Sequence, residues 1–444
     1  MEHALANGAT AVRVSLNKSV TDSYTVLNGQ LDKITHSADR SVYIYLFVDG
    51  RYGTFSTNRL EEKELEDFIS KAIEMVRMLG EDPSRQLPPP ERTEKDALTG
   101  RELGLYDDRY CEIDADKRLE NALKLSIYDR VLSDPAEKGY RLIAEECEYS
   151  CTSDENILID SQGFEGRHSE TTFGTFAEMT IEDMEGCKYS GYWWETSHKA
   201  DDIDLNSCSE TALMRAVRQI GPKKRRSGKY RMVVENTVSS RLVAPLLNAL
   251  NASAIQQKMS FLDGSLGESR FPEGMTLMDM ARTPGRNGSR LFDTEGVATR
   301  NAPIIENGIV RQYFVNTSMS VKLGMEATVE DVSRPCLMPF IKGQDLQTEE
   351  KDVSLKDILK LAGNGILVTG FNGGNCNPVT GDFSFGIEGF AFSKGRISHP
   401  VREMLITGNI MELWNSLLAA GNDARPSSRW QIPSLAFEDV VFSA

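Results

Sequence analysis

The first sixty residues alternate apolar and polar positions as half-buried β-strands do. Val12, Val14 and Leu16 would face one side of such a strand. Further apolar runs flank Asn28-Gly29 and Asp49-Gly50, dipeptides that readily adopt the positive φ angles of a tight hairpin turn. The pattern predicts an antiparallel meander at the start of the chain.

A helical period replaces the alternation after the meander. Apolar residues recur every three or four positions between Leu65 and Leu79, which predicts an amphipathic helix with Asn58 as N-cap and Gly80 as the C′ residue. A second amphipathic helix is expected after Asp114. Further strands are expected at 141–150, 156–160 and 171–181, followed by a short helix after the polar stretch 197–209.

The remaining pattern predicts a second domain. The basic segment 221–228, which contains Lys223-Lys224-Arg225-Arg226 between Pro222 and Gly228, is expected to link domain 1–220 to domain 229–444. The second domain is expected to contain a strand at 230–234, a helix at 238–250, a hairpin at Asn307-Gly308, a strand at 364–371 and a closing helix at 409–420. The predicted class is α+β, with two domains that each combine mainly antiparallel sheet and packed helices.

Composition and charge narrow the class of protein. The chain has 444 residues, with 50 basic and 66 acidic side chains and a formal net charge of −16. Because nucleic-acid affinity depends mainly on basic side chains that neutralise phosphates, this charge disfavours nucleic-acid binding. No apolar run approaches the length of a membrane span, and the seven thinly spread cysteines do not form a disulfide framework. We therefore expect a soluble cytoplasmic protein with free thiols.

The residues alone do not reveal a catalytic site. None of the five histidines stands four or five residues from another, so no helix face offers two imidazoles to one metal ion. Cys147 and Cys151 fall in a predicted strand, where about 13 Å separates them, and we interpret them as buried structural thiols. The chain contains neither a nucleophile elbow nor a phosphate-binding loop.

Several motifs in the C-terminal half, taken in order, resemble the TldD/PmbA family. Residues 292–297 read Phe-Asp-Thr-Glu-Gly-Val and resemble the family's D-x-E-G signature, and 304–309 resemble its I-x-x-G-I element. Residues 375–384 resemble N-x-V-T-G-D-[FY]-S, and 406–409 and 420–423 resemble the segments that close the fold. The weaker similarity of the N-terminal half extends the resemblance over almost the whole chain. The family usually has a helix before the position of Val12, and the short start of this chain departs from that pattern.

The resemblance implies where a metal site would lie. The active branch of the family is a zinc metallopeptidase with an H-E-x-x-x-H helix and a late cysteine. Here the resemblance places the two histidines and the glutamate at Ala244, Ala249 and Pro245, and the cysteine near Trp430 or Gln431. None of these side chains can bind zinc or accept a proton. The chain thus resembles the PmbA (TldE) branch, which lacks the ligands.

That branch implies a non-catalytic subunit. Such a chain pairs with a TldD-like subunit, or with itself, in the processing or degradation of peptides and unfolded segments. It needs no cofactor of its own, because zinc is expected only in the active TldD-type partner. An extended peptide can join a sheet edge through its backbone. We expect the peptide or chamber contacts at Gly373, Gly374, Thr380, Gly381, Asp382 and Phe383.

Two alternatives stay open. The chain could be a hydrolase with a site rebuilt from His168, His198 or Cys376, although no nucleophile and base stand at a recognisable spacing. It could also be a stand-alone binding or regulatory protein linked to DNA gyrase or to toxin–antitoxin control, as the older name of the family suggests.

Overall fold

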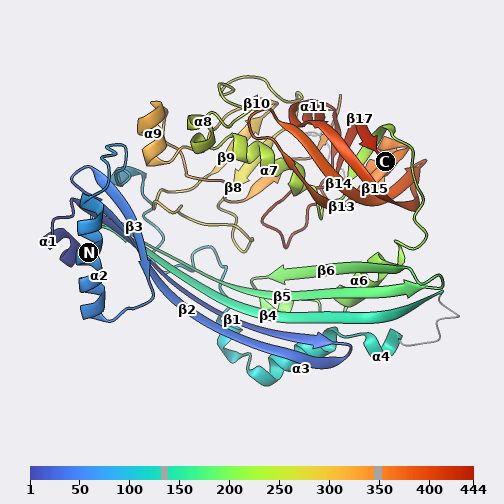
Figure 1. Ribbon diagram of the computed structural model, residues 1–444, viewed down its shortest axis with the longest axis horizontal. Coiled ribbons are helices and arrows are strands. Elements are labelled where there is room, and N and C mark those ends of the chain that lie inside the picture. Colours follow the sequence, from blue (N-terminus) through green and yellow to red (C-terminus); the bar gives the residue numbers. More distant parts are fainter. Residues whose placement is uncertain (132–138, 345–352) are drawn as a thin grey trace. The chain divides into compact units, whose positions relative to one another are not determined.

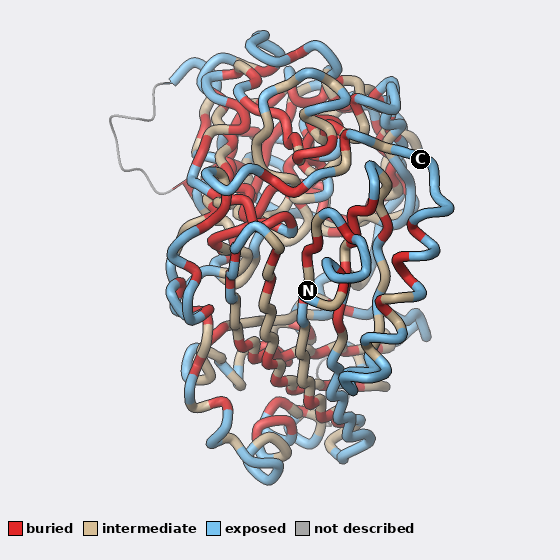
Figure 2. Tube along the Cα trace, turned by 90° about the vertical axis from the view of Figure 1, so that its left-hand side faces the viewer, coloured by how far each residue is buried: buried red, intermediate tan, exposed pale blue. Residues whose placement is uncertain are grey.

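The computed structural model describes residues 1–131, 139–344 and 353–444. Helices and mainly antiparallel sheets make up these residues, which confirms the predicted α+β class. Within the described residues, no helix combines the length and apolar character that a bilayer crossing requires. Buried residues recur along the strands, on one side of the longer helices and in several connecting segments, and they are drawn in red in Figure 2.

The described residues divide into two compact units. The first consists of Met1–Ile220 with Arg282–Thr299, and the second of Gly221–Ala281 with Arg300–Ala444. The chain passes from the first unit to the second between Ile220 and Gly221, at the N-terminal end of the basic segment 221–228. The segment Arg282–Thr299 belongs to the first unit although it lies within the sequence of the second.

A six-stranded antiparallel sheet with the order β3-β2-β1-β4-β5-β6 dominates the first unit (Figure 1). Its strands are β1 (Ala11–Leu27), β2 (Gln30–Val48), β3 (Arg51–Thr57), β4 (Tyr140–Asp160), β5 (Glu165–Asp183) and β6 (Lys188–Ser197). The helices are α1 (Glu2–Ala6), α2 (Glu62–Arg77), α3 (Ala115–Leu125), α4 (Tyr128–Val131) and α6 (Ser207–Val217). Short 3-10 turns occur at Pro90–Arg92, Asp108–Glu112 and Ala200–Asp202. One core lies between the sheet and α3 and α6, and a second lies beneath α2.

Both predicted hairpins are confirmed, but the strands are longer than the pattern indicated. Asn28 and Asp49 adopt φ angles of 49°, and each turn joins two directly paired strands. The two strands predicted at 141–150 and 156–160 form the single strand β4. The polar residues between them also pair with β1 without a break, and this pairing satisfies their backbone hydrogen bonds. Leu16 was predicted to face inward, yet it is exposed while Arg13, which lies over the ring of Tyr45, is buried.

The helix positions are confirmed, whereas two predicted caps are wrong. Helix α2 begins after Glu61 rather than Asn58, and no side chain caps its first turn. It ends at Arg77, and its C-cap Met78 has a right-handed conformation, so Gly80 is not its C′ residue. Helix α3 begins after Asp114 as predicted, and the Asp114 side chain accepts the Lys117 N–H. Helix α1 occupies the short start before β1, where a departure from the family pattern was expected.

The D-x-E-G motif forms a tight turn in the segment that returns to the first unit. Asp293 Oδ1 accepts the N–H groups of Glu295 and Val297, at 2.9 and 3.0 Å. Gly296 has a φ of +87°, and a Cβ there would lie 2.6 Å from the ring of Phe164. Glycine is required at this position for both reasons. The motif therefore shapes the turn that docks the segment against its own unit.

The second unit contains two sheets. The larger has the order β12-β16-β17-β15-β14-β13-β7, in which only β7 and β13 pair in parallel, and the smaller has the order β10-β9-β8-β11. Its strands are β7 (Gly228–Val234), β8 (Leu277–Met280), β9 (Asn301–Glu306), β10 (Ile309–Val310), β11 (Pro335–Leu337), β12 (Phe340–Ile341), β13 (Gly365–Cys376), β14 (Asp382–Ser393), β15 (Arg396–Asn409), β16 (Leu417–Ala420) and β17 (Leu435–Ser443). Its helices are α7 (Ser240–Ala249), α8 (Ala252–Gln256), α9 (Thr317–Leu323), α10 (Leu355–Ala362) and α11 (Ile410–Asn415).

Most predicted elements of this unit are present, with one correction. The strand at 230–234, the helix at 238–250 and the Asn307-Gly308 hairpin correspond to β7, α7 and the β9–β10 turn. The closing helix expected at 409–420 is wrong, because only α11 is helical and β16 follows it. The buried residues of β16 pair with β12 and β17, so sheet formation overrides the local helical period.

Candidate functional site

A cavity of about 570 Å³ lies in the second unit, beside α7. Helix α7 and the segment that follows it form one wall, and the end of β13 with its turn forms another. The lining residues are Arg241, Ala244, Pro245, Leu247, Asn248, Ala249, Asn251, Ser253, Ala254, Gln257, Met259, Phe261, Asp331, Gly374, Asn375, Cys376, Pro378 and Phe385. The three positions at which the resemblance places zinc ligands therefore share one cavity with Gly374.

Helix α7 presents one face to the protein core and another to the cavity. Leu242 and Leu246 are fully buried in the hydrophobic core of the unit. Ala244 and Pro245 are only partly buried and line the cavity. Pro245 lies inside the helix and has no N–H, so the usual intrahelical bond to the carbonyl four residues earlier is missing.

Arg241 brings a positive charge to the cavity. Its Nη2 donates to the carbonyl oxygen of Gly374 at 2.9 Å, and its guanidinium carbon lies 5.2 Å from the centre of the Phe385 ring. Both contacts orient the guanidinium, but neither neutralises it. Sequence reasoning missed Arg241 and Asn248. Their spacing from Ala244 and Pro245 along the helix could have revealed them, because residues three or four apart share a helix face.

Cys376 contributes a thiol to the cavity. Its Sγ lies 3.6 Å from the carbonyl oxygen of Gly381. Burial, and then the negative charge of Asp382, raise the pKa of this thiol. The neutral thiol is a poor nucleophile and a poor metal ligand near neutral pH.

The cavity residues do not fit the zinc ion that the family's active branch holds. Ala244 and Ala249 carry methyl groups and Pro245 a saturated ring, none of which donates to a metal. Trp430 and Gln431 do not belong to the lining residues. In the described ranges, no group of three or more histidine, cysteine or carboxylate side chains is arranged to hold a metal ion.

The other predicted contact residues lie near the end of β13 (Gly373), in the β13–β14 connection (Thr380 and Gly381) and at the start of β14 (Asp382 and Phe383). Thr380 Oγ1 donates to Asp382 Oδ2 at 2.7 Å, and Asn409 Nδ2 donates to Asp382 Oδ1 at 3.0 Å. These two bonds lower the pKa of Asp382. Because Asn409 is the N-cap of α11, its bond to Asp382 connects the turn to the start of that helix. A peptide-binding role for this turn stays a prediction.

Gly373, Gly381 and Phe383 differ in their surroundings. Gly373 and Gly381 both have positive φ angles, of 70° and 79°. Phe383 is buried and stacks on Phe385, with ring centres 5.2 Å apart. Gly374 is the one member of the predicted contact set among the cavity-lining residues.

The histidines considered for a rebuilt site lie in the first unit, and Cys376 lies in the second. His198 is buried, and its Nδ1 donates to the carbonyl oxygen of Thr171 at 2.7 Å. His168 Nε2 lies 3.5 Å from Glu170 Oε2, and its bond to Glu170 lowers the pKa of that carboxyl.

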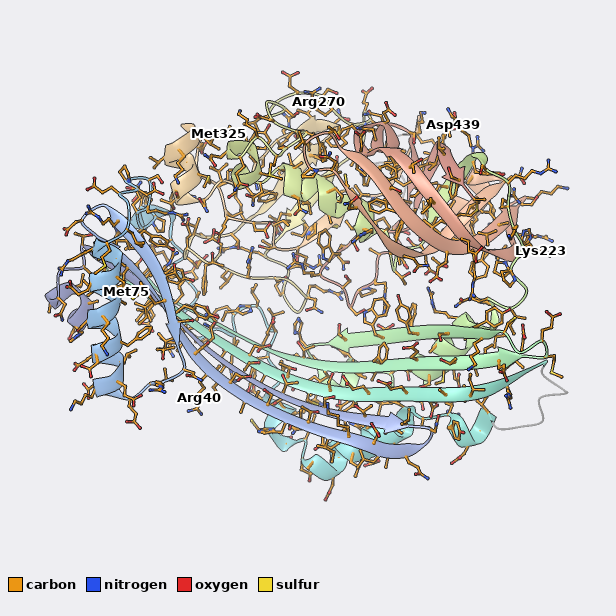
Figure 3. The ribbon with its side chains drawn as sticks, viewed as in Figure 1. Arg40, Met75, Lys223, Arg270, Met325 and Asp439 are labelled. Atoms are coloured by element: carbon orange, nitrogen blue, oxygen red, sulfur yellow. The ribbon has the colours of Figure 1, made fainter. Side chains whose placement is uncertain are left out.

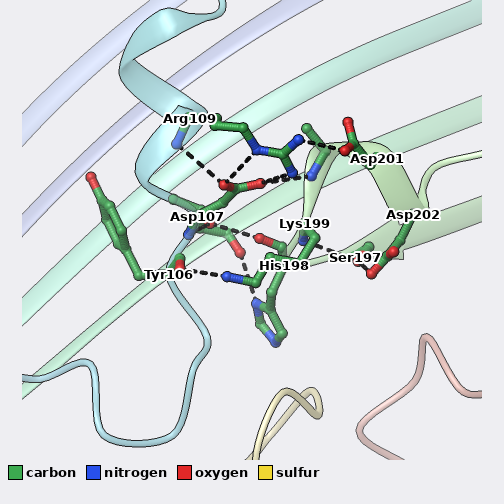
Figure 4. A network of polar contacts seen from close by, with 10 residues as sticks. Tyr106, Asp107, Arg109, Ser197, His198, Lys199, Asp201 and Asp202 are labelled. Atoms are coloured by element: carbon green, nitrogen blue, oxygen red, sulfur yellow. Dashed lines mark hydrogen bonds and ion pairs between the residues drawn. The ribbon is translucent and has the colours of Figure 1, made fainter.

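The surroundings of His198 form a structural network (Figure 4). Lys199 Nζ donates to the carbonyl oxygen of Tyr106 at 2.7 Å, and Arg109 Nη2 donates to Asp107 Oδ2 at 3.0 Å. Arg109 also contacts Asp201. These bonds fasten the 106–109 segment to the segment that follows β6.

Family models match three successive parts of the chain. They are described as PmbA/TldA metallopeptidase domain 1, over residues 12–76, the central domain, over 111–220, and the C-terminal domain, over 227–444. Metalloprotease PmbA of Escherichia coli O157:H7 is 24% identical over 440 residues, which cover 98% of this chain and 93% of that relative.

Solved structures show the same similarity. A protein from Bacteroides thetaiotaomicron VPI-5482, assigned as a candidate modulator of DNA gyrase, is 38% identical, with a TM-score of 0.92, and the match covers 100% of this chain and 97% of that one. TldE from Thermococcus kodakarensis has a TM-score of 0.79 at 17% identity, covering 100% and 98% of the two chains, which shows the fold alone.

An α+β chain matched by metallopeptidase domains along most of its length is a metallopeptidase-like protein. The chain belongs to the TldD/PmbA family.

Proposed function

We propose that this chain is a non-catalytic, PmbA (TldE)-like subunit that acts with a TldD-type zinc metallopeptidase subunit in the processing or degradation of peptides. The zinc ion and the general base belong to the partner. This chain contributes part of the peptide-binding surface.

The composition of the cavity beside α7 carries the proposal. Ala244, Pro245 and Ala249 line it at the positions where the family resemblance places two zinc ligands and the catalytic glutamate. A metallopeptidase needs a metal to activate water and a base to move the proton, and these side chains supply neither. The fold similarity to TldE agrees with this assignment.

The same cavity suits a peptide. Arg241 and the amide side chains of Asn248 and Gln257 offer polar contacts, and Phe261 and Phe385 offer apolar ones. Recognition that uses the peptide backbone would be tolerant of sequence. Gly373, Gly374 and the turn 380–383 are the proposed contact residues on the β13 side.

Purification of three samples tests the proposal: this chain, a TldD-like subunit from the same genome, and both co-expressed. We expect zinc by elemental analysis only in samples with the TldD-like subunit, a mixed complex by native mass spectrometry, and peptide cleavage that depends on that subunit. In the matched control, replacement of the catalytic glutamate in the TldD-like subunit abolishes cleavage by the complex. About one zinc ion per chain in the isolated protein would refute the proposal.

Two results would favour the alternatives. Hydrolysis by the isolated chain that disappears on substitution of His168, His198 or Cys376 would indicate a rebuilt hydrolase. The name of the Bacteroides relative motivates the other alternative, regulation of DNA gyrase. Recovery of gyrase without any TldD-like protein in a pull-down would favour it.

A further inference from the structure

Two charged side chains line the cavity beside α7, Arg241 and Asp331. Arg241 lies in the first turn of α7. Asp331 follows Glu330, whose carbonyl oxygen accepts the side-chain amide of Asn251 at 3.3 Å, and Asn251 lies just after the C-terminal end of the same helix. At the usual rise per residue, about 15 Å of helix separates positions 241 and 251. The positive and the negative side chain therefore belong to opposite ends of the cavity.

The guanidinium of Arg241 is held in place but keeps its charge. One of its N–H groups bonds to the carbonyl oxygen of Gly374, and the ring of Phe385 lies beside it. Among the residues that the structure describes, no carboxylate forms an ion pair with Arg241. The residue is exposed, so its remaining N–H donors can reach a ligand in the cavity. A guanidinium oriented in this way is preorganised to bind a carboxylate through paired hydrogen bonds.

The end of strand β13 presents an open edge at the same cavity. Strand β7 pairs with β13 only as far as Val368, and no strand in the described part of the chain pairs with that edge beyond this residue. The N–H of Asn377 bonds to Asp382 on the side of β14, so the alternation of antiparallel pairing directs the N–H and C=O of Cys376 to the open edge. An extended peptide can pair with these backbone groups.

We infer that Arg241 binds a carboxylate of a peptide that pairs with this open edge. The inference rests on the proposed function, because it takes a peptide as the occupant of the cavity. A peptide carboxylate comes either from the C terminus or from an acidic side chain. The C terminus fits the geometry, because Arg241 already bonds to the carbonyl of Gly374, and a longer strand would meet the guanidinium where its next hydrogen bond should form.

The size and the lining of the cavity also suit the end of a peptide. Its volume of about 570 Å³ lies within the usual range of ligand pockets, about 300–1,000 Å³. Ala244 and Ala249 carry only methyl groups and leave room in the cavity. Met259 and Phe261 add apolar surface to the same lining. An apolar last side chain of the peptide therefore fits beside the carboxylate that Arg241 binds.

Calorimetric titration of the full-length chain with three N-acetylated hexapeptides of alanine and serine that end in leucine tests the inference. The first has a free C-terminal carboxylate, the second a C-terminal amide, and the third a C-terminal amide with glutamate as its penultimate residue. We expect the first to bind at least about tenfold more tightly than the second, because the amide lacks the charge-assisted hydrogen bonds. A third peptide that binds as tightly as the first would support a carboxylate from a side chain. Equal affinities of all three, or no binding of any, would overturn the inference.

Substitution of Arg241 tests the residue itself. Arg241→Gln keeps a hydrogen-bond donor and loses the charge, so the acid and the amide peptide should bind this variant with equal affinity, and the affinity for the amide peptide should stay that of the native chain. Arg241→Lys should retain part of the preference for the acid. Arg270→Gln is the matched control, because Arg270 is an exposed arginine at the surface of the second unit and outside the cavity lining (Figure 3). It should leave the preference unchanged.

The two proposals fail in different ways. A preference for the acid peptide that persists in Arg241→Gln, with the fold intact by circular dichroism, would overturn the carboxylate contact and leave the proposed function in place. Zinc bound to the isolated chain, or the lack of a complex with the TldD-like subunit, would overturn the proposed function, and both are measured without any peptide.

Discussion

Glu145 illustrates how single residues hold distant parts of the first unit together. Its side chain is fully buried, and its Oε1 accepts the N–H of Ile127 at 2.8 Å while Oε2 accepts the hydroxyl of Ser126. Its own N–H donates to Asn28 Oδ1 at 2.9 Å. One residue of β4 therefore supports both the β1–β2 turn and the end of α3.

Glu145→Ala should be strongly destabilising. Removal of the carboxylate leaves buried donors without a partner, and we expect the free energy of unfolding to fall by about 3 kcal/mol. Urea denaturation followed by circular dichroism measures the change. Glu146→Ala, at the exposed neighbouring position, is the control and should change it by less than about 0.5 kcal/mol. Equal effects of the two changes would contradict the assigned role of Glu145.

Arg241 provides a residue-scale test of the proposed peptide contact. If a peptide occupies the cavity, Arg241→Ala should weaken its binding about tenfold, because hydrogen bonds to a charged group are lost. Arg241→Lys should have an intermediate effect, since lysine keeps the charge but loses the planar fork. Calorimetric titration with an unstructured peptide measures the affinity. Arg311→Ala, an exposed residue that pairs with Glu306 outside the cavity, should leave it unchanged.

At the scale of elements, α10 shows how a short helix depends on its first turn. Ser354 and Asp357 form a capping box, and Asp357 also contacts Lys360 at 2.9 Å. The bond from Ser354 and that from Lys360 lower the pKa of Asp357 from 3.8 to about 2. The carboxylate form is therefore the one that stabilises the helix.

The sign of this shift predicts the pH dependence of α10. Because the pKa of Asp357 is lower in the folded state, its contribution is complete above about pH 4 and is lost as the pH falls toward 2. Hydrogen exchange should show α10 amides losing protection over that interval. Asp357→Asn should remove this dependence and weaken protection at neutral pH, whereas Glu64→Gln on α2 should not affect α10. A pH response that survives in Asp357→Asn would exclude this carboxyl as its source.

Element prediction succeeded where a turn or a helical face is encoded locally. Asn28-Gly29 and Asp49-Gly50 identified hairpins because their backbone preferences are intrinsic. The same local pattern wrongly extended the helix of α11 through Leu417–Ala420, where pairing with β17 decides the conformation. The local pattern also missed that residues 151–155, between the two predicted strands, continue the single strand β4.

At the scale of the whole molecule, the cysteines differ in how far they are buried. Cys147, Cys151 and Cys208 are buried, which confirms the interpretation of Cys147 and Cys151 as buried thiols. Burial raises the pKa of Cys147 to about 12, and it also raises the pKa of Cys151. Cys111 and Cys187 are exposed.

Thiol labelling of the native chain should therefore separate these groups. At mild alkaline pH we expect fast modification of Cys111 and Cys187, and modification of Cys147, Cys151 and Cys208 only on unfolding, because the reactive thiolate is scarce and inaccessible in the core. Mass spectrometry of the labelled peptides identifies each site. The denatured, unreduced chain should expose all seven thiols. A smaller number would reveal disulfides and contradict the expected free thiols.

The candidate site could be predicted only in part. The residue types at 244, 245 and 249 could be read directly, because their chemistry does not depend on the fold. Their cavity could not, since it forms only when α7 meets the end of β13, more than a hundred residues later in the chain. Arg241 is recognised as a site residue only in the folded structure, where it contacts Gly374 although the two residues are far apart in the sequence.

The amino-acid sequence alone determined the α+β class, the hairpin turns, the principal helices and the family motifs, because each depends on local backbone preference, periodicity or residue identity. Tertiary structure decided the union of short runs into strands such as β4, the return of Arg282–Thr299 to the first unit and the burial of Glu145. Those features arise from hydrogen bonds and packing between residues remote in sequence. Such contacts leave little trace in any local pattern, because a residue's neighbours along the chain are not its neighbours in space.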